Sequence, residues 1–150
     1  KRFAFGDRES TMGYLVPRYV LWKAGVDLKD LEGYTFMANH NNVALSVLSG
    51  DYEAGAVRDD VFDKYQPKGL RAIAYTPQLS EHLFVAKSTM SRQKMEKLRG
   101  ILLAVGKKPE EQAILNALKL RVTRLSGARD SDYDNIRQIY KTLKNLKEIP

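Results

Sequence analysis

The 150-residue sequence contains no cysteine, two histidines, and no apolar run approaching the roughly 20 residues that a membrane-spanning helix needs. Without cysteine, disulfide bonds, thiolate metal sites and cysteine nucleophiles are excluded, whereas the compartment stays open. Two histidines without cysteine also argue against a zinc site, so we expect neither a metal nor a cofactor. No signal-peptide pattern is present, and the chain opens on a strand-like KRFAF segment, so we expect a mature protein or a fragment.

The charge is unevenly distributed along the chain. Lysine and arginine exceed aspartate and glutamate by 25 to 18. Residues 1–90 hold 11 basic and 11 acidic residues, whereas residues 91–150 hold 14 and 7. The excess is spread through helical patterns, as is typical of a solvated helix face, and no nucleic-acid-binding motif accompanies it. We therefore expect no nucleic-acid partner.

The hydrophobic pattern alternates between short strands and helices, which predicts an α/β fold with an open, mostly parallel sheet flanked by helices. Residues 11–24 are expected to form a helix capped by Ser10 and ended by Gly25, with Pro17 kinking it unless the helix starts later. After Ser91 the pattern becomes helical, and Pro109 is expected to open one of these helices. Further helices are expected over 41–49, around residues 95–105 and around 136–146, and strands over 2–5, 34–38, 54–57, 70–75 and 83–87.

Candidate ligand-binding residues follow the expected strands, because ligands of open α/β sheets gather where strands lead into helix N-termini. Ser10, Thr11 and the amide of Met12 are candidate donors to an anion, although a plain helix cap explains the same residues. His40 ends the second strand unit and could add a hydrogen bond or positive charge. Asp59 and Asp60 follow the third strand and could cap the next helix, bind a cationic group of a ligand or hold another side chain.

Enzymatic motifs are sparse. Ser10, His40 and an aspartate could be imagined as a triad, yet the sequence has neither a GxSxG nucleophile elbow nor an HExxH metal pair. The aromatic residues Tyr14, Tyr19 and Trp22 recur at helical spacing, which favours packing against the sheet over a ligand-stacking surface.

Several segments, in order, resemble one family. These are FAFGDRESTMGYLVP (3–17), NHNNVALSVLSGDYEAGAV (39–57), KKPEEQAIL (107–115) and DSDYDNIR (130–137). Together they are similar to the phosphonate, phosphite and phosphate substrate-binding proteins of ABC transporters, which have the type II periplasmic-binding fold. The first segment is similar to the family's Asp-x-x-SerThrSerGlyTyr signature, with Met12 in place of the second serine.

The resemblance implies that this chain is the second lobe of a two-lobed fold with additional C-terminal helices. Residues 1–80 would form the ligand-binding α/β lobe. Residues 81–150 would form a crossover strand and helices that pack on it and on an absent N-terminal lobe.

The same resemblance implies which residues contact the ligand. Ser10, Thr11 and the Met12 amide would hold the phosphorus oxyanion, and His40 would fall on the ligand-contacting histidine. Asp60 falls where members that hold aminoalkylphosphonates place a carboxylate for the amine. The family's further acid corresponds to His82 or its neighbours, which counts against aminoethylphosphonate.

The expected function is that of a non-enzymatic, periplasmic or extracytoplasmic solute-binding module. It would capture a small anion and pass it to the membrane permease of an ABC transporter, meeting the membrane only through a partner or an anchor outside this chain. Two alternatives stay open. The module could be the sensing input domain of a membrane signalling protein, or an enzyme using His40 as a base on a small anionic substrate.

Overall fold

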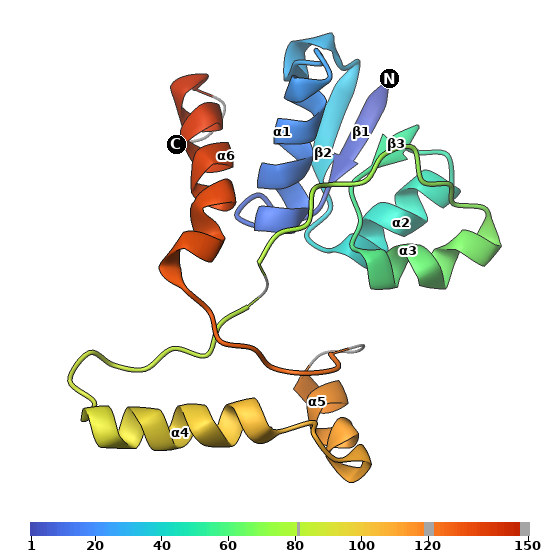
Figure 1. The fold of residues 1–150 in the computed structure, drawn as a ribbon. Coiled ribbons are helices and arrows are strands. Elements are labelled where there is room, and N and C mark those ends of the chain that lie inside the picture. Colours follow the sequence, from blue (N-terminus) through green and yellow to red (C-terminus); the bar gives the residue numbers. More distant parts are fainter. Residues whose placement is uncertain (81, 119–121, 148–150) are drawn as a thin grey trace. The chain divides into compact units, whose positions relative to one another are not determined.

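The computed structural model describes residues 1–80, 82–118 and 122–147 and divides the chain into two compact units (Figure 1). The first unit contains residues 1–79 together with the C-terminal segment that begins at residue 134, and the second contains residues 80–133. The functional division expected at residues 80 and 81 stays a prediction. The last helix belongs to the first unit.

The first unit is built on a three-stranded parallel sheet. β1 (Arg2–Phe5) lies in the centre, between β2 (Gly33–Phe36) and β3 (Ala54–Gly55). Ala4 in the central strand is fully buried and pairs with Thr35 on one side. Helical segments follow all three strands along the chain. This arrangement confirms the expected α/β class with an open parallel sheet flanked by helices.

The first helical segment resolves the question raised by its internal proline. A five-residue π-helical turn, η1 (Thr11–Leu15), leads directly into α1 (Val16–Lys23). Pro17 therefore lies in the first turn of α1, where its missing N–H removes no hydrogen bond within that helix. Gly25 follows with a φ of 80°, a left-handed conformation suited to ending a helix.

Gly55 lets α2 (His40–Leu48), the helix that follows β2, lie close against the sheet. A Cβ atom at this position would lie 2.5 Å from Cγ1 of Val43, which belongs to α2. α2 in turn packs on α3 (Asp59–Tyr65). Their shared apolar cluster consists of Ala44, Val61 and Tyr65, with Leu48, Val57 and Leu70 packed against it.

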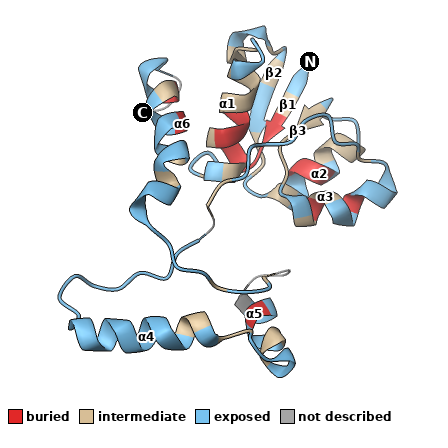
Figure 2. Cartoon of the chain, viewed as in Figure 1, coloured by how far each residue is buried: buried red, intermediate tan, exposed pale blue. Residues whose placement is uncertain are grey.

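The C-terminal helix α6 (Asp134–Asn145) packs on the first helical segment (Figure 1). Ile139 and Leu143 of α6 are buried with Val16 of α1, as the expected helical repeat of apolar residues predicts. Leu146, the last residue of that expected helix, lies beyond the end of α6 and is exposed. Figure 2 shows buried positions along α1, β1 and α2. The residues that pack against the α1–α6 cluster are Met12, Leu15, Tyr19, Val20 and Leu79.

The expected packing of the aromatic residues against the sheet holds for Tyr14. Its ring meets the ring of Phe5 edge-on at a centroid distance of 5.1 Å and that of Phe36 at 5.0 Å. Tyr19 instead packs against the α1–α6 cluster, and its ring lies 5.6 Å from that of Trp22.

Two expected strands do not form. Residues 70–75 and 83–87 contain no strand, although both segments are rich in apolar residues. A strand requires a neighbouring strand that accepts and donates its ladder hydrogen bonds, and the described sheet contains only β1, β2 and β3. Ile73 and Val85 are correspondingly 84% and 85% exposed. The local apolar pattern therefore predicted more strands than the described sheet contains.

The second unit is helical. Its helices are α4 (Arg92–Ala104), the 3-10 turn η4 (Pro109–Glu111), α5 (Gln112–Leu118) and the 3-10 turn η5 (Asp130–Tyr133). Two further 3-10 turns, η2 (Leu28–Asp30) and η3 (Gln66–Lys68), belong to the first unit. In the described ranges, no helix combines the length and the apolar character that crossing a membrane requires.

The starts of these helices agree with the sequence better than their ends. Ser91 caps α4 by accepting a hydrogen bond from the Lys94 amide at 3.4 Å. Pro109 opens η4, as expected. The apolar repeat predicted a helix as far as Val105, but this residue is extended, with a ψ of 134°, and α4 ends one residue earlier.

Candidate functional site

The predicted ligand-binding residues follow the carboxyl ends of three adjacent parallel strands. Immediately beyond β1 and β2, the Met37 amide donates to the Phe5 carbonyl at 2.9 Å. On the other side, the Ala56 amide donates to the Ala4 carbonyl at 3.0 Å. These bonds keep the three departing loops at one edge of the sheet, the edge where α/β proteins commonly bind ligands.

The loop after β1 is a closed turn. The Gly6 amide donates to the Gly13 carbonyl at 2.8 Å, which joins the two ends of the loop. Within it, a carboxylate oxygen of Asp7 accepts from the Glu9 amide at 2.8 Å. A Cβ atom on Gly13 would lie only 2.9 Å from the Cβ atom of Ser10, so a larger residue does not fit without a shift. The turn is thus fixed by backbone geometry and by Asp7.

Ser10 caps the helical segment, as expected. Its Oγ atom accepts a hydrogen bond from the Gly13 amide at 2.9 Å, and its carbonyl accepts from the amides of Tyr14 and Leu15. A hydroxyl that accepts in this way keeps its own proton as a donor. Capping and donation to an anion are therefore compatible uses of the same serine.

The amides of Thr11 and Met12 precede the first residues that have an intrahelical acceptor, so they point out of the helix start. The Thr11 residue is exposed, whereas the Met12 side chain packs against the apolar cluster of α1 and α6. Met12 is thus suited to contribute its backbone N–H to the site while its side chain serves the core.

His40 lies in a turn that Asn39 and Asn42 hold through hydrogen bonds to the backbone. Asn39 caps α2 by accepting from the Asn42 amide at 2.9 Å. The Asn42 side chain donates to the Met37 carbonyl at 2.9 Å. Ala38, which directly precedes Asn39, has a φ of 64°, a left-handed conformation that is uncommon for alanine. Neither asparagine is among the residues expected at the site from the sequence, although Asn is a preferred helix cap.

Burial lowers the pKa of His40 below the ordinary histidine value of 6.5. Hydrogen bonding with the Ala56 backbone opposes this shift and raises the pKa, the charge of Arg58 lowers it, and the charge of Asp60 raises it. The ring is therefore mostly neutral near pH 7. Its Nδ1 atom is buried and has no hydrogen-bond partner in the described part of the chain.

Asp60 is engaged by Arg58, which is not among the residues expected at the site from the sequence. Arg58 Nε lies 2.7 Å from Asp60 Oδ1, and Arg58 Nη2 lies 2.7 Å from Asp60 Oδ2. Of the uses considered for this aspartate, the structure shows that it holds another side chain. The spacing of the two residues on either side of the α3 start was the available sequence signal.

The structure thus brings His40 into electrostatic range of Arg58 and Asp60. Ser10, Thr11 and Met12 lie in the neighbouring loop, and no described hydrogen bond joins them to His40. The Oγ atom of Ser10 is therefore not paired with an imidazole, as a catalytic triad would require.

A separate cleft of about 460 Å³ lies beside β3 in the first unit. Its walls include Leu48, Phe62 and Leu70, with Glu53 and Arg71 among its polar residues. None of the predicted site residues lines it. Because its lining is largely aliphatic and it lies away from the helix starts, it does not correspond to the predicted anion site.

Residues 1–133 match the family of the periplasmic substrate-binding protein of the phosphonate ABC transporter. A probable phosphite-binding protein of an ABC transporter from Prochlorococcus marinus (strain MIT 9301) is 29% identical over an alignment of 159 positions. The alignment covers 97% of this chain and 53% of the relative. The phosphonates-binding periplasmic protein of Escherichia coli (strain K12) is 28% identical over 154 residues, covering 97% and 45%.

The fold has a similar counterpart among solved structures. The Prochlorococcus marinus protein, solved in complex with methylphosphonate, superposes with a TM-score of 0.78 at 28% identity and covers 95% of this chain and 57% of that one. The present chain thus spans about half the length of the relatives that it matches. Given the family match over residues 1–133, the chain belongs to the family of periplasmic phosphonate substrate-binding proteins of ABC transporters.

Proposed function

We propose that this chain forms the anion-binding lobe of an extracytoplasmic solute-binding protein. Its ligand would be a small phosphorus oxyanion, namely phosphite, phosphate or a phosphonate, which the protein delivers unchanged to the membrane permease of an ABC transporter. The family match supports this role, as does the relative solved with methylphosphonate. The proposal includes periplasmic or extracytoplasmic localisation and a site that acts by binding rather than by catalysis.

The observation that carries the proposal is the turn from Ser10 to Gly13. It combines a hydroxyl proton with the amides of Thr11 and Met12 at the start of a helical segment. Backbone amides at a helix start, with the positive end of the helix dipole behind them, favour tetrahedral oxyanions. Because the Gly6–Gly13 bond closes the turn, these donors are held in place before an anion arrives.

His40 supplies the second part of the proposed site. It begins α2, whereas the turn follows the adjacent strand β1, so an oxyanion at the sheet edge would meet both. One ring nitrogen already donates to the Ala56 backbone, so the imidazole donates to the oxyanion from its other nitrogen when it is protonated, the form that an adjacent anion favours. Asp60 would contribute through Arg58 rather than directly.

Isothermal titration of the naturally encoded protein tests the proposal. We expect saturable, one-to-one binding of phosphite, phosphate or methylphosphonate, with the ligand recovered unchanged. Sulfate serves as a tetrahedral control of similar size. His40→Gln should weaken the best ligand by about tenfold or more, since a hydrogen bond to a charged group contributes roughly 1.5 to 3 kcal/mol. Absence of binding for all three phosphorus oxyanions would show that the proposed function is wrong.

A further inference from the structure

The ion pair between Arg58 and Asp60 lies at the same edge of the sheet as the proposed site. Both residues follow β3, and α3 begins between them at Asp59. The guanidinium meets the carboxylate through two bonds of 2.7 Å, one to each oxygen. Such a two-bond arrangement is the strongest that an arginine and a carboxylate form, and it also fixes their orientation.

The carboxylate of Asp60 has a further bond besides those to the arginine. Its Oδ1 atom also accepts from the Val61 amide at 2.9 Å. Its side chain is only 24% exposed, compared with 45% for Arg58. An incoming ammonium group would therefore have to displace a guanidinium that is covalently part of the same chain. Arg58 competes better for the carboxylate than a free ammonium group does, because the chain already holds it two residues from Asp60.

The neighbouring carboxylate of Asp59 does not replace that of Asp60 as a partner for an ammonium group. One of its oxygens accepts from the Asp60 amide at 2.9 Å, within the first turn of α3, and the residue is exposed. Asp60, by contrast, acts electrostatically on His40, and so does Arg58 with the opposite sign. The two charges therefore reach the proposed oxyanion site as a nearly neutral pair.

Resting on the proposed function, we propose that Arg58 determines ligand specificity by occupying the carboxylate of Asp60. The site then accepts phosphorus oxyanions that carry no ammonium group, such as phosphite, phosphate and methylphosphonate. It discriminates against 2-aminoethylphosphonate, because Arg58 already occupies the carboxylate of Asp60 and the ammonium group would meet the charge of Arg58.

Competition titration of the naturally encoded protein with methylphosphonate and 2-aminoethylphosphonate tests this inference. We expect the wild-type protein to bind methylphosphonate at least about tenfold more tightly, the factor that one charge-assisted hydrogen bond provides. Arg58→Gln releases Asp60 and should shift the ratio towards 2-aminoethylphosphonate by a similar factor. Adding Asp60→Asn to that variant should abolish the gain. Arg137→Gln, which breaks an exposed pair with Asp134 on α6, is the matched control and should leave the ratio unchanged.

Equal affinity of the wild-type protein for the two phosphonates would overturn the inference without any variant. An Arg58→Gln protein that keeps the wild-type ratio while its circular dichroism spectrum remains native would also overturn it. Either result leaves methylphosphonate binding, and hence the proposed function, intact. A wild-type protein that binds none of the oxyanions would instead overturn the proposed function and this inference together.

Discussion

Ser10 and Gly13 are joined by a hydrogen bond of 2.9 Å in which the glycine amide donates to the serine Oγ atom. The bond caps the helical segment and directs the serine proton away from it. Ser10→Ala should therefore lower the free energy of unfolding by about 1 kcal/mol and weaken oxyanion binding by roughly tenfold or more. Chemical denaturation and calorimetric titration of the same preparations measure the two effects.

Ser91 provides the control for this substitution, because it caps α4 in the same way at 3.4 Å. Ser91→Ala should reduce stability by no more than Ser10→Ala does and leave ligand affinity unchanged. Unaltered affinity in Ser10→Ala would mean that the serine is a cap and nothing more.

Met12 separates side-chain packing from backbone donation. Its side chain packs against Val16, Ile139 and Leu143, whereas the proposed ligand contact is its amide. Met12→Ala should thus lower the free energy of unfolding by about 1 to 2 kcal/mol, less than for a fully buried methionine. Ligand affinity should change by less than about threefold, well below the effect of one charge-assisted hydrogen bond. Met12→Leu, which conserves volume, should change neither quantity appreciably. A tenfold loss of affinity in both variants would place the side chain itself against the ligand.

His40 makes stability depend on pH. Its pKa is lowered in the folded protein, so between that pKa and 6.5 the unfolded state binds more protons. Its contribution to stability is complete above pH 6.5 and is lost as the pH falls through the lowered folded-state pKa. Unfolding titrations of wild type and His40→Gln across this range isolate the contribution as the difference between the two proteins. We expect the wild type to lose stability relative to the variant on acidification, and the opposite trend would contradict the assignment.

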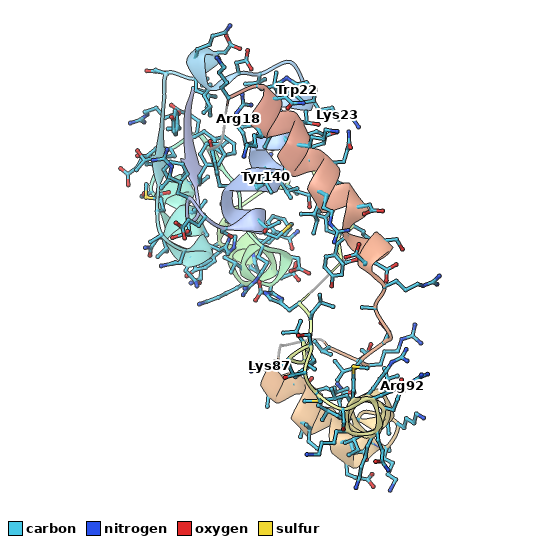
Figure 3. The ribbon with its side chains drawn as sticks, turned by 90° about the vertical axis from the view of Figure 1, so that its left-hand side faces the viewer. Arg18, Trp22, Lys23, Lys87, Arg92 and Tyr140 are labelled. Carbon is cyan, nitrogen blue, oxygen red and sulfur yellow. The ribbon has the colours of Figure 1, made fainter. Side chains whose placement is uncertain are left out.

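Arg18 is a buried cation that serves the fold rather than the site. Its side chain is fully buried, donates to the Val26 carbonyl at 3.1 Å and lies 3.2 Å from the Asp27 carboxylate. In Figure 3 it lies on α1 with Trp22 and Lys23, and α6 with Tyr140 runs alongside. Arg18→Ala should lower the free energy of unfolding by about 3 kcal/mol. Arg137→Ala, at an exposed pair, should cost less than about 1 kcal/mol by the same denaturation measurement. Similar losses for the two would show that burial of Arg18 contributes little.

Much of the fold was predictable because it depends on local pattern. The cap at Ser10, the strand at residues 2–5 and the helix ending before Gly25 are properties of short segments. The strands expected at 70–75 and 83–87 do not form, because strand formation depends on more than local pattern. An apolar extended segment becomes a strand only beside a hydrogen-bonding neighbour, which sequence pattern does not supply.

The sequence predicted which residues follow the strands at the candidate site, but it did not predict the contacts that their side chains make. Ser10 and His40 stood out because hydroxyl and imidazole groups followed strands. That Arg58 holds Asp60 depends on side-chain geometry across the start of α3, and that Met12 packs on α6 depends on residues more than a hundred positions away. Both relationships require the folded chain.

We propose that the turn at residues 10–12 and His40 bind one and the same oxyanion. Nuclear magnetic resonance of the naturally encoded, nitrogen-15-labelled protein during titration with phosphite or methylphosphonate tests this proposal. We expect the Thr11 and Met12 amides and the His40 ring nitrogens to show the largest shifts, all saturating at one shared stoichiometry. Saturable binding with these resonances unmoved would contradict the account, since the ligand would then occupy another part of the molecule.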